Sequence, residues 1–349
     1  MFSIQLENKI YSPSDFSEQP FYEEWLINIQ RVISFWFGKE EVLKIKTSGS
    51  TGLPKEIIIS KKQIEYSALL SGRYFDLKPN QSSLLCIPSD KIGGIMQICR
   101  CILFQMKLIC VKPTANPLIQ IPLISVDTIS LLPNQLYEIL KDENQKSNLR
   151  QFKNILIGGG MLAQNLRNQL REENFPAYLT YGMTETISHI AIQNINRDDP
   201  DVYTVFDEIE ISTDDRDCLC ISNEILCNET VITNDVVELI SNKSFRYKGR
   251  WDNIINSAGV KIFAENLEDK LYEIMDRPFF ISSLPDPKYG QSVVLIIESE
   301  KQMDDLVNKL KSKLEPFEIP KRIIYLKNFV RAGNGKIQRK NTLQSIQSL

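Results

Sequence analysis

The sequence predicts an α/β protein with a large, mostly parallel sheet flanked by helices, a small β subdomain and a small α+β unit at its C-terminal end. Short apolar runs typical of buried strands alternate with segments whose apolar residues recur at helical spacing. This alternation favours a parallel sheet with crossover helices. The chain has 349 residues, of which 24% are charged and 42% hydrophobic, a composition typical of a globular protein with two or three domains.

The expected strands and helices alternate through the first half of the chain. Strands are expected over residues 42–46, 56–59, 83–87, 108–111, 123–128 and 154–157. Helices are expected near residues 93–105, 133–141 and 163–173. Ser60, with Gln63 three residues later, has the pattern of a capping box and predicts another helix that begins there.

The pattern changes after residue 208. Short alternating strands with Asp and Asn turns predict the small β subdomain between residues 208 and 247. A third unit is expected after Gly249, with a helix over residues 302–314. The buried face of this helix is expected to hold Met303, Leu306, Val307, Leu310 and Leu314.

Composition excludes several kinds of site and partner. His189 is the one histidine of the sequence, which excludes three-histidine zinc sites and HExxH proteases. The net charge of −3 does not indicate nucleic-acid binding. The seven cysteines include no CxxC pair and are expected to be buried thiols. Neither a leader peptide nor an apolar run of ~20 residues is recognised, so we expect a cytoplasmic protein with no membrane partner.

Residues 47–55 form a loop rich in glycine and hydroxyl groups between two expected strands. Glycines let the backbone turn its N–H groups toward an anion, and hydroxyls and a lysine bind phosphate oxygens. It is not a Walker A loop, because Pro54 stands where that motif has glycine and Glu56 follows Lys55. The alternative is a flexible Ser/Gly turn.

The loop 47–55 resembles the phosphate loop of the adenylate-forming superfamily, which includes acyl- and aryl-CoA ligases. Five further segments resemble motifs of that family, in the family's order: residues 158–160, 180–186, 233–235, 249–252 and 334–339. Asn234 departs from the family's glycine, and Ala258 breaks a usual glycine pair in the loop 257–261. Each segment alone is compatible with an ordinary turn or surface stretch, but their common order favours the family.

The resemblance implies where ATP and Mg²⁺ bind. The phosphates are assigned to Thr47, Ser48, Gly49, Ser50, Thr51, Gly52 and Lys55. Adenine and ribose are assigned to Gly158, Gly159, Gly160, Thr180, Tyr181, Gly182, Asp235 and Arg250. Thr184 is expected at the α-phosphate, Glu185 at Mg²⁺, and Lys336 as the catalytic lysine of adenylation.

The resemblance also implies a two-step reaction and two domains. A carboxylic acid is activated as an acyl-adenylate and then passes to the thiol of coenzyme A. The expected domains are a large one over residues 1–251, shortened at its N-terminal end relative to the family, and a small mobile one over residues 252–349 that brings Lys336 to the site. Asp252 is the expected hinge.

The segment 181–191 and the short chain most resemble, within this family, the compact o-succinylbenzoate–CoA ligases of menaquinone biosynthesis. That substrate has a second carboxylate, which a buried cation should bind. Lys91 is the candidate, with an ordinary surface lysine as the alternative, and Met183 and Ser188 are also assigned to the acyl substrate. His189 is expected either to line that pocket or to form a hydrogen bond at the start of a helix.

Two other functions stay open from the sequence. One is another aryl- or acyl-CoA ligase, and the other is a nucleotide-binding remnant without catalysis. The partner is expected to be a small carboxylic acid, and the sequence does not indicate an oligomeric state.

Overall fold

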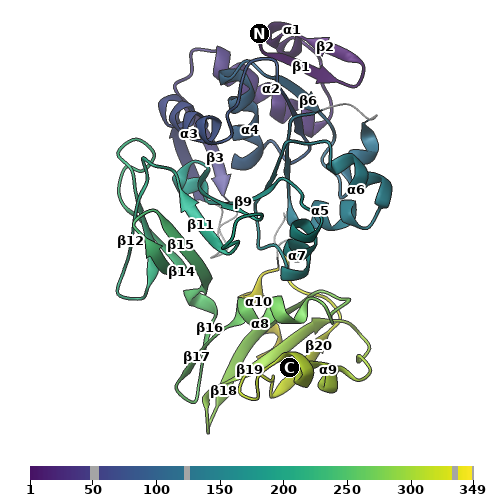
Figure 1. Ribbon diagram of the computed structural model, residues 1–349, viewed down its shortest axis with the longest axis vertical. Helices are drawn as coiled ribbons and strands as arrows, with labels where there is room; N and C mark the ends of the chain where they lie inside the picture. The colour runs from purple at the N-terminus through teal and green to yellow at the C-terminus, as the bar shows by residue number, and fades with distance from the viewer. Residues whose placement is uncertain (48–54, 122–125, 332–336, 348–349) are drawn as a thin grey trace.

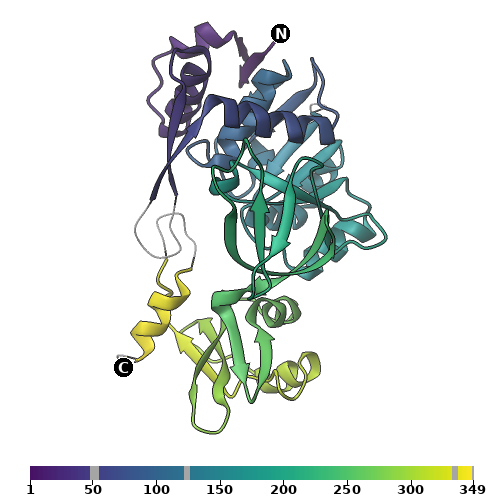
Figure 2. The same cartoon turned by 90° about the vertical axis from the view of Figure 1, so that its left-hand side faces the viewer.

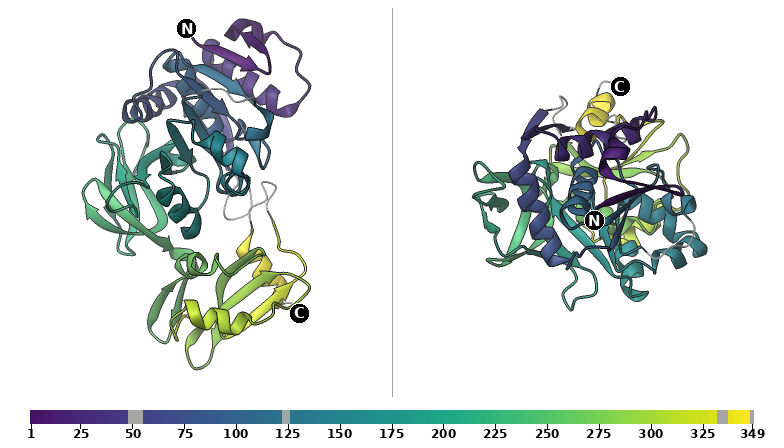
Figure 3. Two further views of the ribbon diagram at one scale, coloured as in Figure 1. Left: turned by 45° about the vertical axis from the view of Figure 1, so that its right-hand side comes forward. Right: turned by 90° about the horizontal axis from the view of Figure 1, so that it is seen from above.

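The computed structural model describes residues 1–47, 55–121, 126–331 and 337–347, which form two parts stacked along the long axis of the molecule (Figures 1 and 3). The N-terminal part, residues 1–250, contains a thirteen-stranded sheet and a separate hairpin of β3 (Val42–Thr47) and β4 (Lys55–Ser60). The C-terminal part, residues 254–347, contains a five-stranded sheet.

Six neighbouring strands of the large sheet are parallel. In spatial order they are β1 (Ser3–Leu6), β6 (Lys107–Cys110), β5 (Ser82–Leu85), β7 (Thr128–Leu131), β8 (Asn154–Ile157) and β9 (Ala177–Gly182). Successive side chains of a strand point to opposite faces, so Leu84 and Leu85 belong to different hydrophobic clusters. Both faces are therefore buried, and the expected fold class is confirmed.

Helices cover both faces of these parallel strands. Helices α2 (Glu24–Phe37), α3 (Lys61–Tyr74) and α4 (Ile92–Leu103) bury their apolar residues in the cluster that contains Leu85. Helices α5 (Pro133–Leu140) and α7 (Gln164–Glu172) bury theirs in the cluster that contains Leu84. The other elements of this region are β2 (Lys9–Tyr11), α1 (Pro13–Ser17), η1 (Pro117–Gln120) and α6 (Glu143–Leu149).

The strands after β9 are antiparallel and continue the same sheet. They follow in the order β10 (His189–Asn194), β11 (Val202–Val205), β15 (Ser244–Arg250), β14 (Val231–Ser241), β13 (Cys218–Ser222) and β12 (Glu210–Thr213). The strands expected between residues 208 and 247 are present. They are joined by hydrogen bonds to the parallel half, because β10 pairs with β9 and β11.

The C-terminal part places helices against a mixed sheet. Its elements are β16 (Ile254–Ser257), β17 (Val260–Phe263), α8 (Ala264–Leu271), β18 (Phe279–Asp286), β19 (Gly290–Glu298), α9 (Leu306–Lys313), β20 (Arg322–Leu326) and α10 (Arg339–Gln347). Figure 1 shows α8 on the side of this part that faces α7. The short helix η3 (Trp251–Asn253) connects the two parts.

Two elements differ from the sequence prediction. Of the strand expected at 123–128, residues 126 and 127 lie outside any strand and β7 begins at Thr128, where the chain comes into register with β5 and β8; residues 122–125 lie outside the described residues. The helix expected at 302–314 spans only Leu306–Lys313, since Asp305 has a φ of +55°. Leu306 and Leu310 are buried as expected, but Val307 is 52% exposed.

Two other sequence predictions are confirmed. All seven cysteines are buried and free of disulfide bonds. Ser60 caps α3, where its hydroxyl accepts from the backbone N–H of Gln63 at 3.2 Å and the Gln63 side chain accepts from the N–H of Ser60 at 2.9 Å. In the described ranges, none of the helices combines the length and hydropathy needed to cross a bilayer.

We predict that Ser60→Ala lowers the free energy of unfolding by about 1 kcal/mol, because a backbone N–H at the start of α3 loses its acceptor. Chemical denaturation followed by circular dichroism measures the change. Lys62→Ala is the matched control, since it alters an exposed position in the first turn of the same helix. A Ser60→Ala midpoint equal to that of wild type contradicts the role of the cap.

Candidate active site

Several predicted site residues meet at the carboxyl ends of β8 and β9, where open α/β sheets commonly bind ligands. Gly158 follows β8, and Thr180 lies beside it on the neighbouring strand β9. The Thr180 hydroxyl donates to the carbonyl of Ile157 at 3.2 Å. A Cβ added to Gly158 would lie 2.4 Å from Thr180 Oγ1, so only glycine fits there. Gly159 has a φ of +82°, which also favours glycine.

Three residues that the sequence assigns to adenine and ribose form one cluster. The Tyr181 hydroxyl donates to Asp235 Oδ2 at 2.7 Å, and Arg250 Nη1 donates to Asp235 Oδ1 at 3.2 Å. The pairing register of β14 and β15 sets Asp235 opposite Arg250, and β9 supplies Tyr181. Asp235 is buried, so its carboxylate is held between two donors that come from distant segments.

The charges of this cluster support the same hydrogen-bond pattern. Burial, together with the charge of Asp235, raises the pKa of Tyr181 well above its usual value, so the hydroxyl stays protonated and donates. Burial disfavours the charged form of Arg250, yet Asp235, Tyr247 and Asp252 together raise its pKa. Each Asp235 oxygen has a second lone pair that can accept from another hydroxyl.

The connection between the two parts is tied to this cluster. Asp252 Oδ2 accepts from Arg250 Nη2 at 3.4 Å and from the side-chain amide of Asn234 at 3.3 Å. Asn234 is the residue that departs from the glycine of the family motif, and here its amide contacts the predicted hinge residue. The hinge role of Asp252 stays a prediction.

The short helix η2 (Thr184–Thr186) contains Thr184 and Glu185, the residues expected at the α-phosphate and at Mg²⁺. The buried hydroxyl of Thr186 accepts from the backbone N–H of Met183 at 3.0 Å and donates to the carbonyl of Ser188 at 2.8 Å, which holds the turn. Met183 is partly buried and Ser188 is buried. Glu185 is exposed and forms no ion pair within the described ranges.

Magnesium ions in nucleotide sites take most of their ligands from phosphates and water, and usually only one or two from carboxylates. The single exposed carboxylate of Glu185 fits that pattern. The described residues contain no cluster of three or more His, Cys, Asp or Glu side chains that would form a metal site built from protein groups alone.

The phosphate-loop residues and the catalytic lysine are placed only in part. Thr47 ends β3 and Lys55 begins β4, and the two residues are paired across the hairpin. Ser48, Gly49, Ser50, Thr51, Gly52 and Lys336 lie outside the described residues, so their roles stay predictions.

Lys91 and His189 lie in different surroundings from those expected. The Lys91 side chain is 48% exposed and its Nζ pairs with Asp90 at 2.7 Å, which favours the alternative of a surface lysine. His189 is buried and begins the strand β10, where a helix start was expected. Its Nε2 forms a hydrogen bond with Ser71 Oγ at 2.9 Å. Burial, with a smaller contribution from the charge of Arg100, lowers the pKa of His189 well below its usual value.

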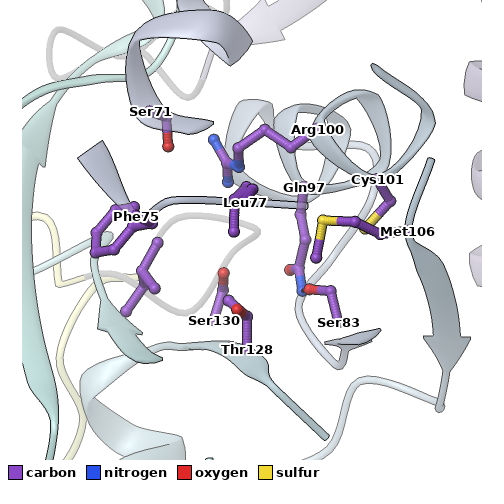
Figure 4. Close-up of a pocket in the computed structure, with 11 residues that line it drawn as sticks. Ser71, Phe75, Leu77, Ser83, Gln97, Arg100, Cys101, Met106, Thr128 and Ser130 are labelled. Atoms are coloured by element: carbon purple, nitrogen blue, oxygen red, sulfur yellow. Dashed lines mark hydrogen bonds between the residues drawn. The ribbon is translucent and has the colours of Figure 1, made fainter. Parts of the chain in front are cut away.

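Arg100 is a buried cation that the sequence analysis did not identify. It lies on α4, is 7% exposed, and forms no ion pair within the described residues. Its Nη1 is buried without a hydrogen-bond partner. Figure 4 shows its guanidinium on the Ser71 side of a small cavity, which Ser83, Thr128 and Ser130 line from the other side. The cavity volume of about 10 Å³ suits roughly one water-sized group.

Among the described residues that line this cavity with Arg100, none is an anion. Burial lowers the pKa of Arg100 to about 10, so the side chain is charged at neutral pH. Burial raises the pKa of Cys101 to about 12, which keeps that thiol protonated. A buried charge without a counterion is costly, so the cavity favours an anionic group from outside the fold. The signal in the sequence is one charged residue in a helix, residues 92–103, whose other residues are apolar except for Gln97.

This cavity lies close to the ATP candidates along the chain and in space. Leu156 lines it from β8, two residues before Gly158. Ser71, which also lines it, contacts His189 directly after the segment 180–188. The same region of the sheet therefore carries the proposed nucleotide residues and an unneutralised cation.

Known proteins share both the sequence motifs and this fold. The model of the AMP-binding enzyme family matches residues 42–211. The 2-succinylbenzoate–CoA ligase of Lactococcus lactis is 27% identical over 343 residues, covering 92% of this chain and 75% of that protein.

Two solved proteins are also similar. A protein of Dyadobacter fermentans, described as acyl-CoA synthetase (AMP-forming)/AMP-acid ligase II-like, is 30% identical, has a TM-score of 0.64, and covers 96% of this chain and 99% of its own. The O-succinylbenzoate coenzyme A synthetase of Bacillus subtilis, solved with ATP and magnesium ion, has the same fold, with a TM-score of 0.74 at 19% identity over 86% of this chain and 69% of its own. On the family match and the Dyadobacter relative, the chain belongs to the AMP-binding family of adenylate-forming enzymes, as one of the AMP-forming acyl-CoA synthetases.

Proposed function

We propose that this enzyme activates a carboxylic acid that carries a second carboxylate, using ATP and Mg²⁺, and transfers the acyl group to coenzyme A. The proposed acid is o-succinylbenzoate, and the product is its coenzyme A thioester. The observation that carries the proposal is the Asp235 cluster, which brings together three residues assigned to adenine and ribose in a chain of the acyl-CoA synthetase family. The names of the Lactococcus and Bacillus relatives support the same acid.

The first step forms the acyl-adenylate. An oxygen of the reacting carboxylate attacks the α-phosphorus of ATP, the bond from that phosphorus to the bridging oxygen breaks, and pyrophosphate leaves. Charge spreads over the phosphate oxygens in this displacement, so positioned cations supply most of the stabilisation. Lys336 is the proposed cation from the protein. Glu185 would hold Mg²⁺, which when bound neutralises phosphate charge.

The second step transfers the acyl group. The thiol sulfur attacks the activated carbonyl carbon, the bond from that carbon to the AMP oxygen breaks, and the thiol proton passes to solvent. Because the two steps need different partners at one carbonyl, we propose that residues 252–349 are a domain that changes orientation about Asp252 between them.

The described residues bind the nucleotide in the proposed complex through the Asp235 cluster. The free lone pairs of Asp235 accept from the ribose hydroxyls, and Arg250 and Tyr181 keep that carboxylate in place. The ring of Tyr181 is held at its edge by Phe245, at 5.1 Å between centroids, which orients it for contact with adenine.

In this proposal Arg100 binds the second carboxylate, for which the water-sized cavity beside Arg100 would have to widen. A guanidinium forms charge-assisted hydrogen bonds with a carboxylate, and the surrounding hydroxyls can donate to the same group. Lys91 is less suited, because it is half exposed and already paired with Asp90.

We predict ATP–pyrophosphate exchange that depends on o-succinylbenzoate and that Lys336→Ala lowers by about 100-fold or more, since a charge at the reacting phosphate is removed. Lys340→Ala, at an exposed position four residues later, is the matched control and should keep the wild-type rate. Folded wild-type protein that shows no exchange with any acid of a panel of mono- and dicarboxylic acids contradicts the proposal and favours the remnant.

We predict that Asp235→Asn weakens ATP binding by about 10- to 100-fold, because hydrogen bonds to a charged acceptor contribute roughly 1.5–3 kcal/mol. Titration calorimetry measures the dissociation constant in the absence of the acid. Asp207→Asn, at an exposed acidic position of the same part, is expected to bind ATP as wild type does. If Asp235→Asn and Asp207→Asn bind ATP with equal affinity, Asp235 does not belong to the nucleotide site.

We predict that Arg100→Met raises KM for o-succinylbenzoate by about 100-fold, while a monocarboxylic analogue that lacks the second carboxylate is used as before. The same substitution should raise the unfolding free energy without substrate, because a buried charge with no counterion is removed. Lys91→Met is the control and should leave both KM values unchanged. If Lys91→Met raises KM for o-succinylbenzoate and Arg100→Met does not, Lys91 and not Arg100 binds the second carboxylate.

A further inference from the structure

One ion pair joins the two parts of the molecule at a distance from their covalent connection. Arg167 of α7 belongs to the N-terminal part, and Asp269 of α8 belongs to the C-terminal part. Arg167 Nη2 and Asp269 Oδ2 are 2.6 Å apart, and the two side chains are only 18% and 16% exposed. Figure 1 shows the two helices facing one another where the parts meet. The pair is therefore sheltered by the interface between the parts.

A second acid lies beside the same arginine. Arg167 Nη1 is 3.6 Å from Asp201 Oδ1, and both residues belong to the N-terminal part. Arg167 thus keeps an acidic neighbour when Asp269 leaves. Burial raises the pKa of Asp269 to about 6, although Arg167 is adjacent, so Asp269 loses hydration when the parts meet and regains it when they separate.

Helix α8 is attached to the N-terminal part at two points. Near its start, Glu265 accepts from the Asn253 side chain at 2.6 Å, next to the connection, and a Cβ added to Gly249 would lie 2.9 Å from Glu265 Oε2. Asp269 lies one turn further along the same face of the helix and reaches Arg167. With one point of attachment the C-terminal part could rotate relative to the N-terminal part, and the second point fixes its orientation.

The orientation seen in the structure suits the first chemical step. Figure 2 shows the strands β3 and β4 running toward the C-terminal part of the molecule. Arg331 and Ile337, which pair with one another as an isolated bridge, flank the segment whose sequence contains Lys336. The hairpin that flanks the proposed phosphate loop thus extends toward the part that carries the Arg331–Ile337 bridge.

We infer that Arg167 and Asp269 are positioning residues that hold the C-terminal part in the orientation for acyl-adenylate formation, and that their separation permits thioester formation. This inference rests on the proposed two-step function. Neither residue contacts the proposed nucleotide cluster, so both act through the orientation of the part that carries Lys336.

The test measures the two steps separately. Arg167→Ala and Asp269→Asn are each expected to slow pyrophosphate release in a single turnover by roughly three- to tenfold, as expected for a sheltered ion pair worth about 1 kcal/mol. Transfer of the acyl group from preformed acyl-adenylate to coenzyme A should be unchanged or faster.

Further variants test the pair itself. Arg167→Lys should restore much of the rate of pyrophosphate release, and the variant with both Arg167→Ala and Asp269→Asn should be no slower than either single variant. Arg171→Ala, exposed on the same helix, is the control.

A second readout does not depend on activity. Cysteines introduced by Ser147→Cys on α6 and Ser312→Cys on α9 are exposed, whereas the seven native cysteines are buried, so fluorescent labels attach selectively. Energy transfer between the labels should show one main orientation in wild type and a broader distribution in Arg167→Ala. An unchanged distribution, or equal slowing of both steps, overturns the inference. Wild-type protein that forms no acyl-adenylate refutes the proposed function instead, and the energy-transfer comparison still decides the role of the pair.

Discussion

The Asp235 carboxylate is the interaction that joins the main pieces of this molecule. It accepts from Tyr181 at the end of the parallel half of the sheet and from Arg250 at the end of the antiparallel half. Arg250 in turn contacts Asp252, where the chain passes into the C-terminal part. One buried anion therefore aligns the proposed nucleotide site with the connection about which the second part would turn.

The continuity of the large sheet is what makes that alignment possible. The β-rich region is hydrogen-bonded to the parallel strands through β10 and β11, so it cannot move independently of them. Parallel strands bring their carboxyl ends to one edge, and the antiparallel strands extend that edge toward the connection. Rigid elements on both sides thus hold a site whose predicted catalytic lysine belongs to another part of the chain.

Arg100 shows a different use of burial. Protein interiors usually pair a buried charge, because an isolated one is costly. Here the described polar neighbours are hydroxyls, the Gln97 amide, a protonated thiol and a neutral histidine, and none of them neutralises the arginine. Burying the Arg100 charge without a counterion destabilises the folded protein, so a ligand that brings a negative charge to Arg100 is strongly favoured there.

Local patterns in the sequence predicted much of the fold and part of the site. The capping box at Ser60 and the strand over residues 154–157 depend on neighbouring residues alone, and both are confirmed. Residues 126 and 127 of the strand predicted at 123–128 lie outside β7, because pairing with strands remote in sequence decides where β7 begins. Hydropathy also could not show that Val307 is exposed, since Asp305 interrupts the predicted helix by its backbone conformation.

The sequence by itself determined the family, through motifs whose spacing and order are chemical requirements for holding a nucleotide. Only the tertiary structure decided which cation is buried and unpaired. Lys91 lies beside Asp90 in the sequence and pairs with it, whereas the groups around Arg100 come from α3, β5 and β7. The Arg167–Asp269 contact joins residues about a hundred positions apart. Charge neutralisation and burial depend on such distant neighbours, which a linear pattern does not contain.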